Sequence, residues 1–281
     1  MKTDRLKIII LLCSLALVLP FLCLTAEGKD FTVVIDPGHG GHDPGAIGRR
    51  GKEKNINLNV ALKVGRLIQN NCKDVKVIFT RRSDVFIPLD RRAQIANNAK
   101  ADLFISIHTN SVARGRNVRG TETDTLGLHR TEENLEVAKK ENSVILIEDN
   151  YQQRYAGFNP NSSESYIIFE FLQDKNMEKS VKLATLIQKQ FKTSARRIDK
   201  GVHQAGFLVP VLVELGYIST PDEEQYLLSD TGSEALANSI YKAFLNYKRE
   251  HDAPIDRSKV QQPEMPEPEE SVAETPTDEP D

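Results

Sequence analysis

The chain has 281 residues, a formal net charge of −3 and only three cysteines. The acidic balance comes from Asp252–Asp281, which holds ten acidic and two basic residues, so the rest of the chain is mildly basic. No basic strip is interleaved with aromatic residues, which argues against a nucleic-acid-binding protein and leaves no nucleic acid among the expected partners.

The amino-terminal segment is typical of a secretory signal peptide. Three basic residues precede an almost unbroken apolar run from Ile8 to Leu24, and Ala26 is a suitable cleavage position. An uncleaved membrane anchor is the alternative, but Pro20 interrupts the run, which is barely long enough to span a bilayer. We therefore expect residues 1–26 to be removed from an exported protein with no stable membrane span. Cys72 is then the only cysteine, which excludes an intrachain disulfide.

Residues 29–250 are long enough for one domain with its own core. Apolar runs typical of strands alternate with amphipathic patterns typical of helices, which favours βαβ units. We predict an α/β fold: a single domain with a twisted, mostly parallel central sheet flanked by helices on both faces. The predicted strands are Phe31–Asp36, Val75–Thr80, Asp102–His108, Ala205–Val209 and Val211–Leu215, and the predicted helices follow Glu53 and cover Arg91–Ala99, Thr131–Asp149, Met177–Ser194 and Gly232–Tyr247.

Two histidines and one glutamate fall at the ends of these elements. His39 lies in the glycine-rich loop after the first strand, His108 ends the third strand, and Glu53 begins a helix. In open α/β sheets, ligands bind at the carboxyl ends of the strands. Two imidazoles and one carboxylate at that edge make an open zinc site, with the fourth position left for water.

Seven short segments carry a further pattern: Asp36–Gly41, Asp43–Ala46, Gly51–Lys54, Thr80–Arg81, Ala96–Asn97, Ser106–Asn110 and Val213–Ser219. In these segments the chain resembles the zinc-dependent N-acetylmuramoyl-L-alanine amidases of bacterial cell-wall turnover. The matches occur in family order and span about residues 31–248.

The resemblance implies one zinc ion per chain, held by His39, Glu53 and His108. It also implies that Glu214 is the general base and acid, which takes the proton of the attacking water and delivers it to the leaving amine. The expected reaction is hydrolysis of the amide between N-acetylmuramic acid and L-alanine, in cell-wall turnover and daughter-cell separation. Peptidoglycan in the periplasm or cell envelope is then the expected partner, together with an envelope activator protein.

Two other functions stay open. A different metallopeptidase of the envelope is one, and a degenerate amidase that only binds peptidoglycan is the other. The second is motivated by the direct junction of Val209 and Pro210, where family members place several more residues. A strand displaced by one residue at this point would turn Glu214 to the opposite face of the sheet.

The segment from Thr131 to Ala195 has charge-rich helical patterns and a polar interval at Gly157–Ser165. In some members of the family, the corresponding insertion carries a helix that covers the zinc until an activator removes it. Glu141, Glu148 and Glu164 are the candidate carboxylates for such a plug. The alternative is a set of ordinary helix faces turned toward water.

The remaining candidates have structural interpretations or no constellation around them. Asp36 and Asp102 are strand-end or turn residues rather than catalytic groups. His42 is a loop residue, and His203 has a structural and a substrate-binding interpretation. His129 and His251 lack polar partners in the sequence pattern. Residues 251–281, rich in Pro and Glu, form a tail that is expected to be disordered.

Overall fold

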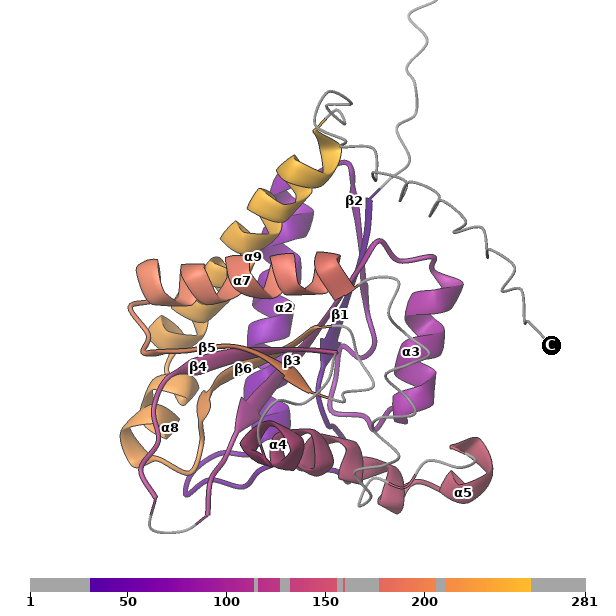
Figure 1. The fold of residues 1–281 in the computed structure, drawn as a ribbon, viewed down its shortest axis with the longest axis vertical. Coiled ribbons are helices and arrows are strands. Elements are labelled where there is room, and N and C mark those ends of the chain that lie inside the picture. Colours follow the sequence, from indigo (N-terminus) through magenta and orange to yellow (C-terminus); the bar gives the residue numbers. More distant parts are fainter. Residues whose placement is uncertain are drawn as a thin grey trace, which may run out of the picture.

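The computed structural model describes residues 31–113, 116–126, 132–155, 159, 177–205 and 211–253. Six strands form one sheet in the order β2-β1-β3-β6-β4-β5 (Figure 1). All neighbouring strands are parallel except β4 and β6, which are antiparallel. The strands are β1 (Phe31–Pro37), β2 (Val75–Phe79), β3 (Leu103–Asn110), β4 (Thr121–Leu126), β5 (Asp199–Ala205) and β6 (Val211–Tyr217).

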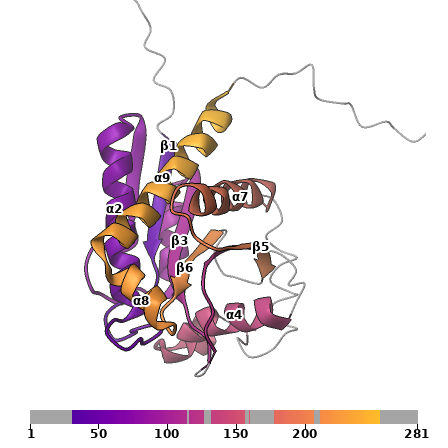
Figure 2. The same ribbon diagram turned by 90° about the vertical axis from the view of Figure 1, so that its left-hand side faces the viewer.

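Helices cover both faces of this sheet, which confirms the predicted α/β class. Figure 2 shows α2 and α4 on opposite sides of the strands. None of the helices in the described part of the chain is both long and apolar enough to cross a membrane. The helices are α2 (Glu53–Asn71), α3 (Leu89–Asn98), α4 (Glu132–Asn142), α5 (Tyr151–Arg154), α7 (Met177–Thr193), α8 (Pro221–Leu228) and α9 (Asp230–Asp252), with a 3-10 helix η2 (Ser143–Ile147) between α4 and α5.

The main core lies between one face of the sheet and helices α2, α7 and α9. Because side chains alternate along a strand, every second residue of the central strands points to this face. Those residues are apolar and fully buried, and they pack against the apolar stripes of the three helices. They include Val33, Ile35, Ile105, Ile107, Val213 and Leu215 from the strands, and Val60, Ile187 and Phe244 from the helices.

The alternate residues of the same strands are mostly polar and point to the opposite face. A smaller apolar cluster lies there, in which Leu135 and Ala138 of α4 and Ile145 of η2 pack on Leu212. The insertion α4–η2–α5 is therefore seated on the polar face, and this face carries the candidate site. The polar strand residues are Asp36, Ser106, His108, Glu214, Glu122 and Asp124.

The structural interpretation of two aspartates is borne out. Asp36 is buried, accepts hydrogen bonds from Thr80, Ser106 and Arg92, and forms an ion pair with Arg92 at 2.7 Å. Asp102 accepts a hydrogen bond from the backbone N–H of Thr32. Both carboxylates thus join neighbouring strands and are occupied by these contacts.

Several predicted boundaries are corrected by the structure. The structure shows a strand, β5, at Asp199–Ala205, where a polar run pairs with β4. Of the strand expected at Ala205–Val209, only Ala205 lies among the described residues. Strand β4 and helix α8 had no counterpart among the predicted elements. The Val209–Pro210 connection, the expected signal peptide at 1–26 and the tail beyond 253 lie outside the described residues.

Candidate metal centre

His39 is presented by the loop that follows β1. It has a φ of 61°, a conformation that residues other than glycine rarely adopt. Two buried arginines hold the loop in this shape: Arg92 donates to the carbonyl oxygens of Pro37 and His39, and Arg81 donates to those of Pro37 and Gly38. The loop geometry is therefore fixed by its surroundings rather than by local preference.

The ring of His39 is oriented by the carboxylate of Asp43. Its Nδ1 lies 2.7 Å from Oδ2 of Asp43, and both side chains are nearly buried. If Nδ1 donates to Asp43, Nε2 points its lone pair into the site. This carboxylate–histidine pair is the usual arrangement behind a histidine that binds a metal.

Glu53 is the first residue of α2 and is fully buried. Its Oε2 accepts a hydrogen bond of 2.7 Å from the backbone N–H of Ala46, and its Oε1 accepts one of 2.9 Å from that of Thr109. A carboxylate at a helix N-terminus is also favoured by the helix dipole. Glu53 is thus held from both sides, by its own loop and by the end of β3.

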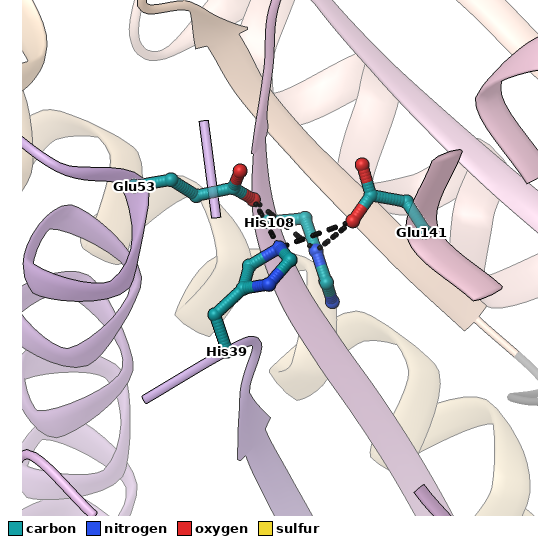
Figure 3. A group of neighbouring side chains, drawn as sticks. All are labelled: His39, Glu53, His108 and Glu141. Carbon is teal, nitrogen blue, oxygen red and sulfur yellow. Dashed lines mark hydrogen bonds and ion pairs between the residues drawn. The ribbon is translucent and has the colours of Figure 1, made fainter. Parts of the chain in front are cut away.

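His108 lies on β3, directly beside the His39 loop. A Cβ on Gly38 would lie 2.3 Å from Nε2 of His108, so only glycine leaves room for this ring. Nδ1 of His108 lies 3.2 Å from Oε1 of Glu53. The three residues predicted to bind zinc are therefore brought together near the carboxyl ends of strands β1 and β3 (Figure 3).

A fourth residue, Glu141 of α4, completes the group. Its Oε2 lies 3.1 Å from Nε2 of His39 and 2.9 Å from Nδ1 of His108. The four ligand atoms lie within 4.8 Å of one another, and Figure 3 shows them facing a common point. In a tetrahedral zinc site with bonds of ~2.1 Å, the ligand atoms are about 3.4 Å apart. The distances of 2.9–3.2 Å between the histidine nitrogens and the carboxylate oxygens are compatible with such a site.

Nε2 of His39 forms a hydrogen bond of 3.1 Å with Oε2 of Glu141, but the hydrogen-bond geometry at His108 favours a metal ion. Nδ1 of His108 is close to two carboxylates but forms no aligned hydrogen bond with either. Ligands that face a common centre show this arrangement, whereas a histidine that only donates to a carboxylate would be aligned with it. The donor set of two histidines and carboxylates is one that zinc accepts.

The charges of the four residues are strongly coupled. Burial disfavours a charged histidine, but Glu53 raises the pKa of His39 and Glu141 raises the pKa of His108. Against the effect of burial, His39 lowers the pKa of Glu53, and Lys140 and His108 lower the pKa of Glu141. Two buried carboxylates require positive charge at this point, which a divalent cation supplies directly.

Glu214 lies beside the group but outside it. On β6 it pairs with His108 of β3 and with Glu122 of β4, so its side chain shares the polar face with His108. The one-residue displacement of this strand is therefore absent. Both carboxylate oxygens are buried and have no hydrogen-bond partner in the described part of the chain. Burial and the charge of Glu141 raise the pKa of Glu214, while Lys140 opposes this shift.

For the insertion that contains α4 and η2, the sequence allows two interpretations: a plug over the metal site, or ordinary helix faces turned toward water. Glu141 and Glu148 are only 4% and 5% exposed, so the expectation of helix faces turned toward water is wrong for both. Glu164 lies outside the described residues. A usable signal was the helical spacing of Leu135, Ala138 and Asn142, which marks the buried face next to Glu141.

The other histidines take no part in the group. His42 packs against Phe86 in a tilted arrangement with ring centroids 4.1 Å apart, and His251 packs edge-on against Phe31. Nε2 of His203 lies 3.8 Å from the carboxylate of Glu122, at the far end of the polar face. His129 lies outside the described residues.

A family model and two relatives that match this chain carry the same description. Residues 33–246 match the model of the Amidase_3 family, described as N-acetylmuramoyl-L-alanine amidase. The chain is 31% identical to the N-acetylmuramoyl-L-alanine amidase AmiA of Escherichia coli, over 79% of this chain and 77% of that protein. It is 32% identical to a putative N-acetylmuramoyl-L-alanine amidase of Buchnera aphidicola, over 78% and 95% of the two chains.

Two solved structures that resemble this fold are also N-acetylmuramoyl-L-alanine amidases. An N-acetylmuramoyl-L-alanine amidase from Clostridium difficile 630 superimposes with a TM-score of 0.58 at 26% identity, over 79% of this chain and 98% of that one. The catalytic domain of CwlV from Bacillus (Paenibacillus) polymyxa gives a TM-score of 0.55 at 27% identity, over 78% and 98%.

Proposed function

Because the chain belongs to the family of N-acetylmuramoyl-L-alanine amidases, we propose that it hydrolyses the amide between N-acetylmuramic acid and L-alanine of peptidoglycan with one zinc ion. One observation carries this proposal. Nε2 of His39, Oε1 of Glu53 and Nδ1 of His108 converge at one point of the sheet edge, and Glu214 lies next to that point in the register of β3 and β6.

His39, Glu53 and His108 would hold the zinc ion. When bound there, zinc supplies Lewis acidity, which polarises an amide carbonyl and lowers the pKa of water toward about 7. The surrounding chain fixes the ligands before any metal arrives, since Asp43 orients the ring of His39 and two backbone N–H groups orient Glu53. A site prepared in this way loses little free energy in reorganisation.

Glu214 is our choice for proton transfer. A carboxylate at this position takes a proton from the attacking water and returns it to the nitrogen of L-alanine as the carbon–nitrogen bond breaks. Its burial and its lack of a hydrogen-bond partner keep both oxygens available for this role. The register of β6 supports an active enzyme over a degenerate amidase that only binds peptidoglycan.

We further propose that helix α4 inhibits the resting protein. Glu141 takes the fourth position of the group, which a reacting water or substrate oxygen would need. Nζ of Lys140 lies 3.0 Å from the other oxygen of Glu141 and partly compensates its charge. An envelope activator that withdraws α4 would open the site, in a protein that is exported with the loss of residues 1–26 and that acts in the periplasm or cell envelope.

Replacing Glu141 with alanine should raise basal hydrolysis of soluble muropeptides about ten- to hundredfold, because a buried charged contact contributes roughly 1.5–3 kcal/mol to the closed form. Product release by the zinc-loaded proteins measures this effect. Glu136→Gln is the matched control, since Glu136 pairs with Lys139 on the exposed side of the same helix and should leave the rate unchanged. A loss of activity in Glu141→Ala would place Glu141 in the working site instead.

The reaction itself is tested by the new amino termini that appear in purified sacculi treated with the zinc-loaded Glu141→Ala protein. N-terminal alanine is expected. Other amino termini would identify a different envelope metallopeptidase. Binding to sacculi without any new terminus would identify a peptidoglycan-binding protein.

A further inference from the structure

The far end of the insertion makes a second set of contacts, away from the metal centre. It docks on the first turn of α3, whose Arg92 fixes the His39 loop. Oε1 of Glu148 accepts a hydrogen bond of 2.9 Å from the backbone N–H of Leu89. The hydroxyl of Tyr155 accepts one of 2.9 Å from the backbone N–H of Asp90 and donates one of 3.0 Å to Oε2 of Glu148.

These contacts supply what α3 lacks in its own sequence. The residue before α3 is Pro88, which has no side chain that could cap the helix. The first N–H groups of a helix have no partner within the helix. Two of them, on Leu89 and Asp90, are satisfied here by the insertion, and the Glu148 carboxylate also suits the positive end of the helix dipole.

Charge and packing reinforce the same contact. Arg154 makes a two-pronged ion pair with Asp90, and its Nη1 lies 3.4 Å from Oε2 of Glu148, whose side chain is fully buried. Burial raises the pKa of Tyr155, so its hydroxyl keeps the proton that it donates. Leu89 and Tyr155 also pack against the apolar cluster that seats α4 on Leu212.

We propose that Glu148, Arg154 and Tyr155 form a latch that holds the insertion on the N-terminus of α3 and sets the fraction of molecules with a covered metal centre. The proposal rests on the inhibitory role of α4 given above. The side-chain hydrogen bonds and ion pairs described for the three latch residues go to Leu89, Asp90 and one another, and to no proposed metal ligand, so we expect the latch to act mainly on the closing equilibrium. A partner that loosens the latch could open the site without touching the metal.

Two substitutions test the latch with little risk to folding. Tyr155→Phe keeps the ring but removes the hydroxyl that joins Asp90 to Glu148, and Asp90→Asn weakens the partly exposed pair with Arg154. In the zinc-loaded full chain, each should speed amide hydrogen exchange of residues 132–155 and raise basal muropeptide hydrolysis about five- to thirtyfold. Glu136→Gln again serves as the control and should change neither.

Combining each substitution with Glu141→Ala separates the latch from the reaction. If both contacts close the same element, the double variants should gain much less than the product of the two single effects. Unchanged exchange and unchanged hydrolysis in both latch variants would overturn the latch. Faster exchange without hydrolysis in any variant, Glu141→Ala included, would support the latch and count against the proposed reaction instead.

Discussion

Glu214→Gln, placed in the Glu141→Ala background so that the site is open, should lower turnover of soluble muropeptides by about 10²–10⁴, the usual effect of removing a positioned proton-transfer group. The amide keeps the size of the carboxylate but cannot take up the proton of water. Because Glu214 lies outside the group that faces the metal position, zinc content should stay at one ion per chain. Steady-state rates together with metal analysis measure both quantities.

The same substitution at Glu122 is the matched control, because Glu122 pairs with Glu214 in the register of β4 and β6. Its carboxylate accepts hydrogen bonds from Asn110 and from the hydroxyl of Tyr217, so it is already occupied. We expect Glu122→Gln to cost far less activity than Glu214→Gln. Equal losses, or loss of zinc from Glu214→Gln, would remove the assignment of Glu214 as the proton-transfer group.

His108→Ala should release the zinc and abolish hydrolysis, since it removes one of three proposed protein ligands and leaves a space under Gly38. His39→Ala should have the same effect. Metal content after dialysis against a weak chelator is the direct measurement. His42→Ala is the control, because His42 packs against Phe86 and does not belong to the group that faces the metal position. Full zinc retention in either ligand variant would exclude that residue from the centre.

The clustering of His39, Glu53 and His108 was predictable because each lies at or near the end of an element with a clear hydrophobic pattern. His39 lies in the loop directly after the buried strand β1, His108 lies near the carboxyl end of the buried strand β3, and Glu53 begins a long amphipathic helix. In a parallel sheet such ends meet at one edge, so local patterns are enough to place these side chains together. For Glu141, the helical spacing of Leu135, Ala138 and Asn142 marks only which face of α4 is buried. The position of Glu141 also depends on how the insertion packs on Leu212, a contact between residues far apart in the sequence.

Strand β4 shows why part of the fold was not predicted. Its sequence Thr121–Leu126 alternates threonines with acidic residues, so it lacks the apolar face that marks a buried strand. The threonines face α7, where Thr121 and Thr123 hydrogen-bond Gln188, and the acidic residues line the polar face. Such a strand has no hydrophobic pattern in its own sequence, and only its pairing with β5 and β6 in the structure reveals it.

The cap that the insertion provides to α3 has a consequence for the lifetime of the active protein. In the proposed activation, withdrawal of the insertion would expose Leu212 and leave the first N–H groups of α3 to water, so the proposed active state would also be the less stable one. We expect the activated protein to be cleaved faster by proteases than the resting one. A wall-degrading enzyme of this design would limit its own damage, because each molecule that is switched on also becomes easier to destroy.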